Sequence, residues 1–174
     1  MEDISRYIVN LLEQGDHQIQ ELEDFVLDAA QDLKRSQEKL LHHQKYYYNI
    51  FSLYQSPLPS ADDYAYDYLI SLFTDNPKPK PQSFDKYHLD TPPTYWLRER
   101  WSVPFIELPR QEQVRLIREY TSEQRQETLD WNLKQQSKSL KEIQKHRAIL
   151  DKWKTKLLQL RSARKRAAEQ FMSQ

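Results

Sequence analysis

The amino-acid sequence predicts an all-α protein in which two long helices form an antiparallel coiled-coil hairpin, joined by a short helix and a proline- and aromatic-rich extended connection. Three observations predict this fold class. All nine prolines lie between Pro57 and Pro109, the chain has one glycine, and apolar residues recur every seven positions on both sides of the proline-rich part. We therefore expect a first arm at 1–55, a connecting region at 56–109 and a second arm at 110–174.

Proline and glycine are the residues that most often interrupt helices. A proline inside a helix costs about 3 kcal/mol, so the absence of proline from both flanks leaves them free to be continuous helix. One glycine in 174 residues also argues against hairpin-rich β folds and glycine-rich phosphate loops, because both need residues with positive φ. Without cysteine, the chain has no disulfide, no thiolate metal site and no thiol nucleophile.

The first arm carries two interleaved series of residues spaced seven apart. The stronger series is apolar at every position: Leu12, Ile19, Val26, Leu33, Leu40, Tyr47 and Tyr54. The weaker series contains small or polar residues, which suit places where a partner helix comes close: Ile8, Gly15, Leu22, Ala29, Ser36, His43 and Ile50. Repetition over four or more heptads predicts a coiled-coil seam.

The second arm carries a matching seam in its later part. One series is Ile143, Leu150, Leu157, Arg164 and Phe171, and the other is Ser139, His146, Trp153, Leu160 and Ala167. Apolar residues near the start of this arm follow a different frame: Val114, Leu116, Ile117, Tyr120, Thr128, Leu129, Trp131 and Leu133. The polar run at 134–139 separates the two frames and predicts a stutter or local bend there.

Opposite charges on the two arms predict their relative direction. Residues 2–32 hold nine acidic residues and one basic, a net charge of −8, whereas residues 138–166 hold eleven basic and two acidic, a net charge of +9. An antiparallel hairpin brings these two stretches together, so the charges select partner and direction while the apolar seam stabilises the pair. The same pattern also fits arms that pair between two chains.

The connecting region begins with a short helix expected at about 61–74. Ser60 is a candidate N-cap, Asp63 stands at the capping-box position, and Pro77 helps to end the helix. The chain that follows, up to Pro109, has the composition of extended, polyproline-like chain with one turn around Tyr95–Trp101.

Aromatic residues gather in and beside this connecting region. Exposed tyrosine and tryptophan next to arginine make a good protein-binding patch, because they give a large contact area at low entropic cost. The candidate partner-binding residues are Tyr64, Tyr66, Tyr68, Tyr95, Trp96, Arg98, Arg100 and Trp101. The alternative is that the aromatics form a small core that fixes the connecting region onto the arm ends, and each interpretation can hold for different residues.

The basic stretch of the second arm offers a second kind of surface. It could neutralise nucleic-acid phosphates or anionic lipid, although the acidic first arm competes for the same charges. The candidate nucleic-acid-binding residues are Lys154, Arg161, Arg164, Lys165 and Arg166. No aromatic stacking platform is interleaved with them, which argues against binding of single strands.

Nothing in the sequence has the spacing of a catalytic or metal site. Asp62, Asp63 and Asp67 suit the first turn of a helix, whose dipole favours negative charge. His42 and His43 are adjacent rather than four apart on one helix face. We expect no enzyme activity, no cofactor and no metal.

The leading hypothesis is a non-enzymatic structural or adaptor protein that binds a protein partner or a second copy through its coiled coil and aromatic-rich end. The runner-up is a helical, nucleic-acid-associated subunit of a nucleoprotein complex that uses the basic stretch. No transmembrane segment or signal peptide is recognisable, so a soluble, cytoplasmic protein is expected.

Overall fold

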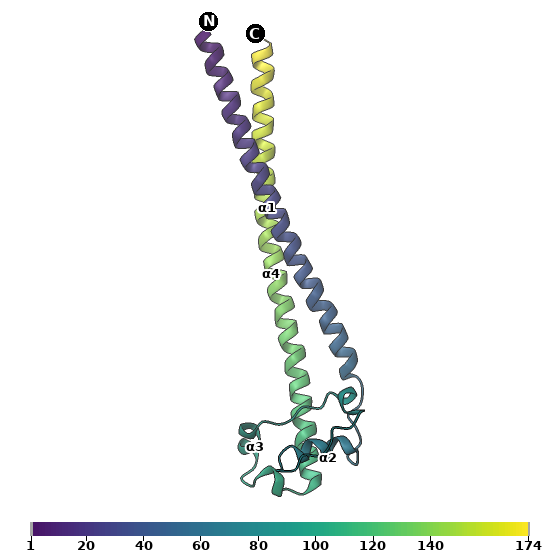
Figure 1. Cartoon of the computed structure of the whole chain (residues 1–174). Coiled ribbons are helices and arrows are strands. Elements are labelled where there is room, and N and C mark those ends of the chain that lie inside the picture. The colour runs from purple at the N-terminus through teal and green to yellow at the C-terminus, as the bar shows by residue number, and fades with distance from the viewer. Residues whose placement is uncertain (1, 174) are drawn as a thin grey trace. The chain divides into compact units, whose positions relative to one another are not determined.

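The computed structural model describes residues 2–173, and the side chains of residues 6, 7 and 9–173. These residues form two long helices, α1 (Glu2–Tyr54) and α4 (Arg110–Met172), two short ones, α2 (Tyr64–Ser71) and α3 (Thr94–Arg100), and the 3-10 helices η1 (Phe84–Tyr87) and η2 (Phe105–Glu107). Residues 2–173 contain no strand. Helices α1 and α4 pack against each other (Figure 1), which confirms the all-α helical hairpin.

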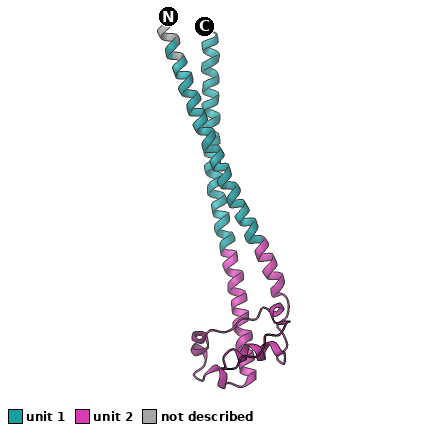
Figure 2. Ribbon diagram, in the orientation of Figure 1, with its two compact units in different colours: residues 1–44, 135–174 teal, residues 45–134 magenta. Residues whose placement is uncertain are grey.

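The chain divides into two compact units, which we describe separately (Figure 2). The arm unit comprises residues 1–44 and 135–174, and the aromatic unit comprises residues 45–134. Both long helices run through both units, because residues 45–54 of α1 and residues 110–134 of α4 belong to the aromatic unit.

Cross-arm contacts in the arm unit confirm the predicted antiparallel direction. Arg164 Nη2 donates to Asp16 Oδ2 at 3.0 Å, and Arg161 pairs with Glu23. The rings of Phe25 and Trp153 lie 5.0 Å apart, and Lys39 Nζ lies 3.7 Å from Glu142 Oε2. In these four pairs the two residue numbers add to between 178 and 184, so the register is constant along the arms and the hairpin closes within one chain.

The predicted heptad positions of α1 form the packed seam. None of the seven residues of the stronger series is exposed, and neither are Gly15, Leu22, Ala29, Ser36, His43 and Ile50 of the weaker series. The remaining member, Ile8, lies outside the described side chains. The most deeply buried positions belong to the weaker series, because Ala29 and Ser36 are small enough to let α4 come close.

The seam of α4 is confirmed in its middle and departs from the prediction near its end. Ile143, Leu150 and Leu157 are buried, but Ala167 is exposed and Phe171 is 44% exposed. A groove of about 410 Å³ opens there, lined by both arms. Gly15 contributes to it, because it has no side chain to fill the space opposite α4.

The frame change predicted in α4 is visible in the spacing of its non-exposed residues. Thr121, Arg125, Thr128 and Asn132 follow one another at spacings of four and three, and the later seam starts at Ser139. Gln135, Ser139 and Ile143 then follow at two successive spacings of four, as in a stutter. The prediction is wrong for two members of the early frame, Trp131 and Leu133. Both side chains are exposed because Asn132, which lies between them, is the buried residue of this turn.

The helix of the connecting region starts later than predicted. Its N-cap is Asp63 rather than Ser60, since Asp63 Oδ1 accepts from Ala65 N at 2.9 Å, while the carbonyl of Ser60 accepts from Asp63 N in a preceding turn. The helix therefore covers Tyr64–Ser71 instead of 61–74. The single turn expected around Tyr95–Trp101 is the seven-residue helix α3.

The core of the aromatic unit lies where α2, α3 and η2 meet the start of α4. Its buried residues are Ala65, Tyr66 and Leu69 of α2, Leu89 of the segment between η1 and α3, Trp96 and Leu97 of α3, Phe105 of η2, and Val114, Leu116 and Ile117 of α4. Each large apolar side chain removed from water contributes about 1.5–3 kcal/mol, so this cluster is what holds the connecting region against α4.

Candidate protein-binding site

The N-terminus of α2 is fixed by its capping aspartate. Asp63 uses one carboxylate oxygen to cap the helix, and the other accepts a hydrogen bond from the Tyr87 hydroxyl at 3.0 Å. This bond and the partial burial of the hydroxyl raise the pKa of Tyr87. Both oxygens of the Asp63 carboxylate therefore accept hydrogen bonds that connect α2 to η1.

Tyr66 joins α2 to α4 through a buried hydrogen-bond network. Its hydroxyl donates to the carbonyl of Pro59 at 3.0 Å and accepts from Arg118 Nε, also at 3.0 Å. A second Arg118 nitrogen, Nη2, donates to the same carbonyl at 2.9 Å. Burial raises the pKa of Tyr66, partly offset by the Arg118 guanidinium, so its hydroxyl stays neutral and keeps donating.

Helix α3 is held against α4 by Trp96 and Arg100. Trp96 Nε1 donates to Glu123 Oε2 at 2.8 Å, and the Trp96 ring meets Tyr120 edge to face at 5.2 Å. The Arg100 guanidinium lies 3.7 Å from the centre of the Trp96 ring and donates to Glu119 and Glu123. These contacts fix α3 as a rigid edge beside η2.

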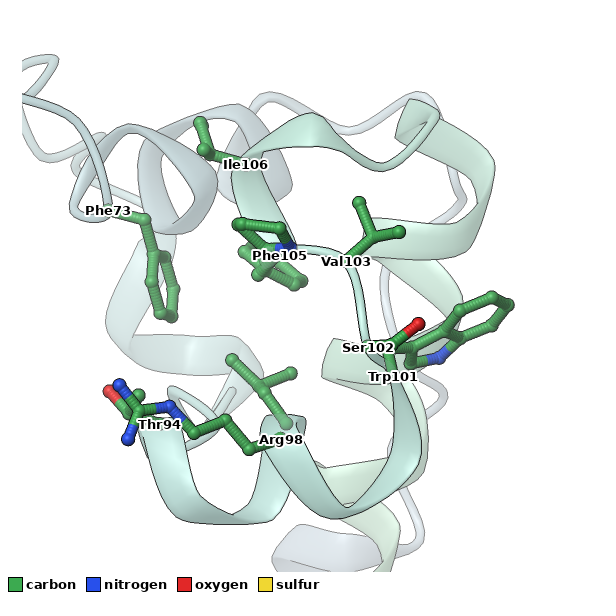
Figure 3. Close-up of a pocket in the computed structure, with 10 residues that line it drawn as sticks. Phe73, Thr94, Arg98, Trp101, Ser102, Val103, Phe105 and Ile106 are labelled. Carbon is green, nitrogen blue, oxygen red and sulfur yellow. The ribbon is translucent and has the colours of Figure 1, made fainter.

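A pocket of about 320 Å³ opens between α3 and η2 (Figure 3). Its walls are Phe73, Thr94, Leu97, Arg98, Trp101, Ser102, Val103, Pro104, Phe105 and Ile106. Figure 3 shows Phe73, Phe105 and Ile106 on one side of the opening and Thr94 with Arg98 on the other. The walls are therefore mainly apolar, with one guanidinium among them.

Arg98 differs from the other arginines of the aromatic unit. The other five all have partners: Arg100 with Glu119 and Glu123, Arg110 with Asp67, Arg115 with Glu112 and Glu119, Arg118 with Tyr66, and Arg125 with the carbonyl of Tyr87. The exposed side chain of Arg98 has no hydrogen bond or ion pair within residues 2–173. The one unpaired arginine of this unit thus stands at the pocket.

The structure divides the eight predicted partner-binding residues. Tyr66 and Trp96 are core residues, so for these two the core interpretation replaces a role in direct contact. Tyr68 and Trp101 are half-buried; the ring of Tyr68 packs edge to face on Phe84, and Trp101 forms part of the pocket wall. Tyr64, Tyr95, Arg98 and Arg100 are exposed, but Arg100 is engaged within the chain. Only Arg98 and Trp101 of the set line the pocket.

Sequence reasoning missed most of the pocket wall. Phe73, Leu97 and the segment 102–106 come together only because α3 and η2 fold back on each other. A signal for this segment was present: the run Val103, Pro104, Phe105 and Ile106 is apolar, although it lies in a region otherwise rich in polar residues and proline. An apolar run beside a helix end can form a pocket wall as well as an extended strand.

The five candidate nucleic-acid-binding residues lie in the arm unit. Arg161 and Arg164 pair with Glu23 and Asp16 across the seam, and Lys165 lies 3.9 Å from Glu169 of its own helix. Lys154 and Arg166 are exposed and have no ion pair within the described part of the chain. Nucleic-acid binding stays a prediction.

Two kinds of site are not found in the described residues. Between residues 2 and 173, no three histidine, aspartate or glutamate side chains are grouped so that they could hold a metal ion. None of the helices there combines the length and the apolar character that a membrane span requires. The chain matches no protein-family model, no curated protein and no solved structure.

Proposed function

We propose that this chain is a non-enzymatic adaptor or structural protein whose aromatic unit binds a protein partner at the pocket between α3 and η2. The single observation that supports this most is the unpaired Arg98 beside a mainly apolar pocket. A volume of about 320 Å³ is at the small end for ligand sites and suits one or two side chains of a partner.

The chemistry of the walls suggests what the partner presents. An apolar side chain would enter between Phe73, Phe105 and Leu97, where it leaves water. A carboxylate beside it would meet Arg98, since arginine binds carboxylates through two parallel hydrogen bonds. The partner segment is therefore a short peptide with a large apolar residue next to an aspartate, a glutamate or a C-terminal carboxylate.

The rim of the pocket supports the same proposal. Val103 is 43% exposed and Ile106 is 44% exposed, and both line the pocket. Large apolar and aromatic side chains that stay in water around a pocket are typical of protein-binding surfaces. A peptide that lies across the rim would cover them.

Selection from a random peptide library on the full chain tests the proposal. Enriched peptides should carry a large apolar residue beside a carboxylate, and their affinity should be measured by calorimetry. Arg98→Glu should weaken these peptides by roughly tenfold or more and should select lysine or arginine at the same place. Ile106→Asp should weaken all of them, because it places a charge in the apolar wall.

Arg166→Glu is the matched control, because Arg166 is also an exposed arginine without an ion pair among the described residues but lies in the arm unit. It should leave peptide affinity unchanged. Circular dichroism should show equal helicity in all variants. Peptides that bind the Arg98→Glu and Ile106→Asp variants as tightly as the unaltered chain would rule the pocket out.

A further inference from the structure

The outer sides of the arm unit carry charges that the hairpin leaves without partners. On α1, Glu13, Glu21, Asp24 and Asp28 are exposed and pair with no basic residue within residues 2–173. On α4, the exposed basic residues with no acidic partner in the same part of the chain are Lys138, Lys141, Lys145, Arg147, Lys152, Lys154, Lys156 and Arg166. Closing the hairpin therefore uses only part of the complementary charge.

Each arm also places like charges close together along its own surface. Asp24 and Asp28 are four residues apart on α1, as are Lys141 and Lys145 on α4. Like charges at this spacing repel each other and weaken a helix, whereas most solvent-exposed helices alternate the sign. A surface of opposite charge laid along each arm would turn this repulsion into attraction.

Four exposed leucines lie on one face of the arm unit, which we call the leucine face: Leu27, Leu41, Leu140 and Leu158. Residues three, four or seven positions apart share a helix face. Leu27 is four residues after Glu23, and Leu158 is three before Arg161, so both flank the Glu23–Arg161 ion pair. Leu41 is two heptads after Leu27, and Leu140 is three heptads before Arg161, which places all four on the same side.

We propose that the leucine face binds a second copy of this chain, so that two hairpins form a four-helix bundle in which the acidic α1 of each copy lies against the basic α4 of the other. This assembly is separate from the peptide pocket and does not depend on it. A two-fold symmetric pair can place the same face of both copies together in two ways. If the axis runs across the arms, α1 lies on α1 of the second copy, so like charges meet. If the axis runs along the arms, α1 lies on α4 of the second copy, so acidic residues meet basic ones.

The register of the hairpin then fixes which residues meet. Within the hairpin, residues of α1 and α4 that lie level with each other have numbers that add to about 180. A two-fold axis along the arms keeps this register between α1 of one copy and α4 of the other. Leu41 then faces Leu140 of the second copy. Asp24 faces Lys154, and Glu13 faces Lys165, whose own ionic partner in the described residues is Glu169 of the same helix.

These four charged residues lie on the leucine face. Glu13 is two heptads before Leu27 and Asp24 is three residues before it, while Lys154 and Lys165 are four residues before and seven after Leu158. The face therefore combines apolar contact with paired charge. A nucleic acid fits it less well, because the acidic side of α1 runs along the same face and repels phosphate.

Sedimentation equilibrium of the full chain tests the assembly. In about 0.05 M salt, the mass should rise with concentration from 21.1 kDa towards twice that value, and about 0.5 M salt should shift it back. The double variant Glu13→Lys with Asp24→Lys should stay monomeric, and so should Lys154→Glu with Lys165→Glu. An equimolar mixture of the two variants should recover the dimer, because each supplies the charge that the other lacks.

The matched control is Glu21→Lys with Asp28→Lys, which changes the net charge by the same amount at positions about 100–120° around α1 from Leu27. This control should dimerise like the unaltered chain. A chain that stays monomeric at submillimolar concentration in low salt would overturn the proposal, and so would a mixture that stays monomeric. Binding of a DNA duplex by a monomeric chain, lost in Lys154→Glu with Lys165→Glu, would assign the basic surface to nucleic acid instead.

Discussion

Removing the hydroxyl of Tyr66 tests how α2 and the preceding chain are attached to α4. The substitution Tyr66→Phe keeps the ring, which is fully buried, and leaves no large cavity. It removes a hydrogen bond to the carbonyl of Pro59 and one from Arg118 Nε. The carbonyl keeps its bond from Arg118 Nη2, so the group left without a partner is the Arg118 Nε–H.

The expected cost follows from these two bonds. A neutral hydrogen bond contributes about 0.5–1.5 kcal/mol net, and one to a charged group about 1.5–3 kcal/mol. Because Arg118 is half-buried, water replaces part of the second bond. We therefore expect Tyr66→Phe to lower the free energy of unfolding by about 2 kcal/mol.

Urea unfolding followed by tryptophan fluorescence gives the measurement, because Trp96 and Trp101 report on the aromatic unit. Tyr64→Phe is the matched control: Tyr64 lies two residues earlier on α2, is 46% exposed, and its ring contacts Lys78. That change should cost less than about 0.5 kcal/mol. Equal unfolding free energies for the two variants would refute the role assigned to the Tyr66 hydroxyl.

Three further substitutions or conditions probe other parts of the account. Gly15→Ala should stabilise the arm unit by roughly 0.5–1 kcal/mol in thermal unfolding, because a methyl group there meets no atom within 4 Å and glycine is unfavourable inside a helix. A lower melting temperature would contradict the open space beside Gly15. Ser36→Leu should destabilise the arm unit by about 1–3 kcal/mol, since it overfills the closest part of the seam, and an unchanged melting temperature would contradict that close approach. The folded-state pKa of Tyr66 lies above its ordinary value of 10.0, so the stability it contributes is complete below pH 10 and is lost as the pH rises further; Tyr66→Phe should flatten this alkaline decline in a urea series.

The long helices and their direction could be predicted from the sequence because they depend on local and periodic features. Because all prolines lie between Pro57 and Pro109, the sequence predicted that the long helices would end and begin close to Tyr54 and Arg110. The heptad series identified the residues of the seam. Charge segregation predicted the antiparallel pairing that Asp16 with Arg164 and Glu23 with Arg161 display. Each of these signals extends over several turns, so single exceptions do not hide it.

The aromatic unit could be predicted only in part because its contacts are not periodic. Tyr66 and Tyr64 look alike in the sequence, yet the first is buried and the second exposed, since only Tyr66 faces α4. Asp63 rather than Ser60 caps α2 because a turn at 60–63 comes first. The chain also turns at His88, whose φ of 49° lies in the left-handed region. Residues other than glycine seldom adopt this conformation, so the sequence did not predict a turn there.

Closure of the hairpin within one chain is the claim on which the seam, the register and the leucine face all depend, and a pulsed electron-spin distance measurement tests it most directly. The chain has no native cysteine, so spin labels at Gln18→Cys and Ser162→Cys would be the only ones, on two exposed positions of α1 and α4 whose numbers fit the register. Dilution with excess unlabelled chain leaves only distances within one molecule. Helices packed at 8–10 Å predict a label distance of roughly 20–30 Å that survives dilution; a distance beyond roughly 50 Å, or a short one that disappears on dilution, would contradict the hairpin.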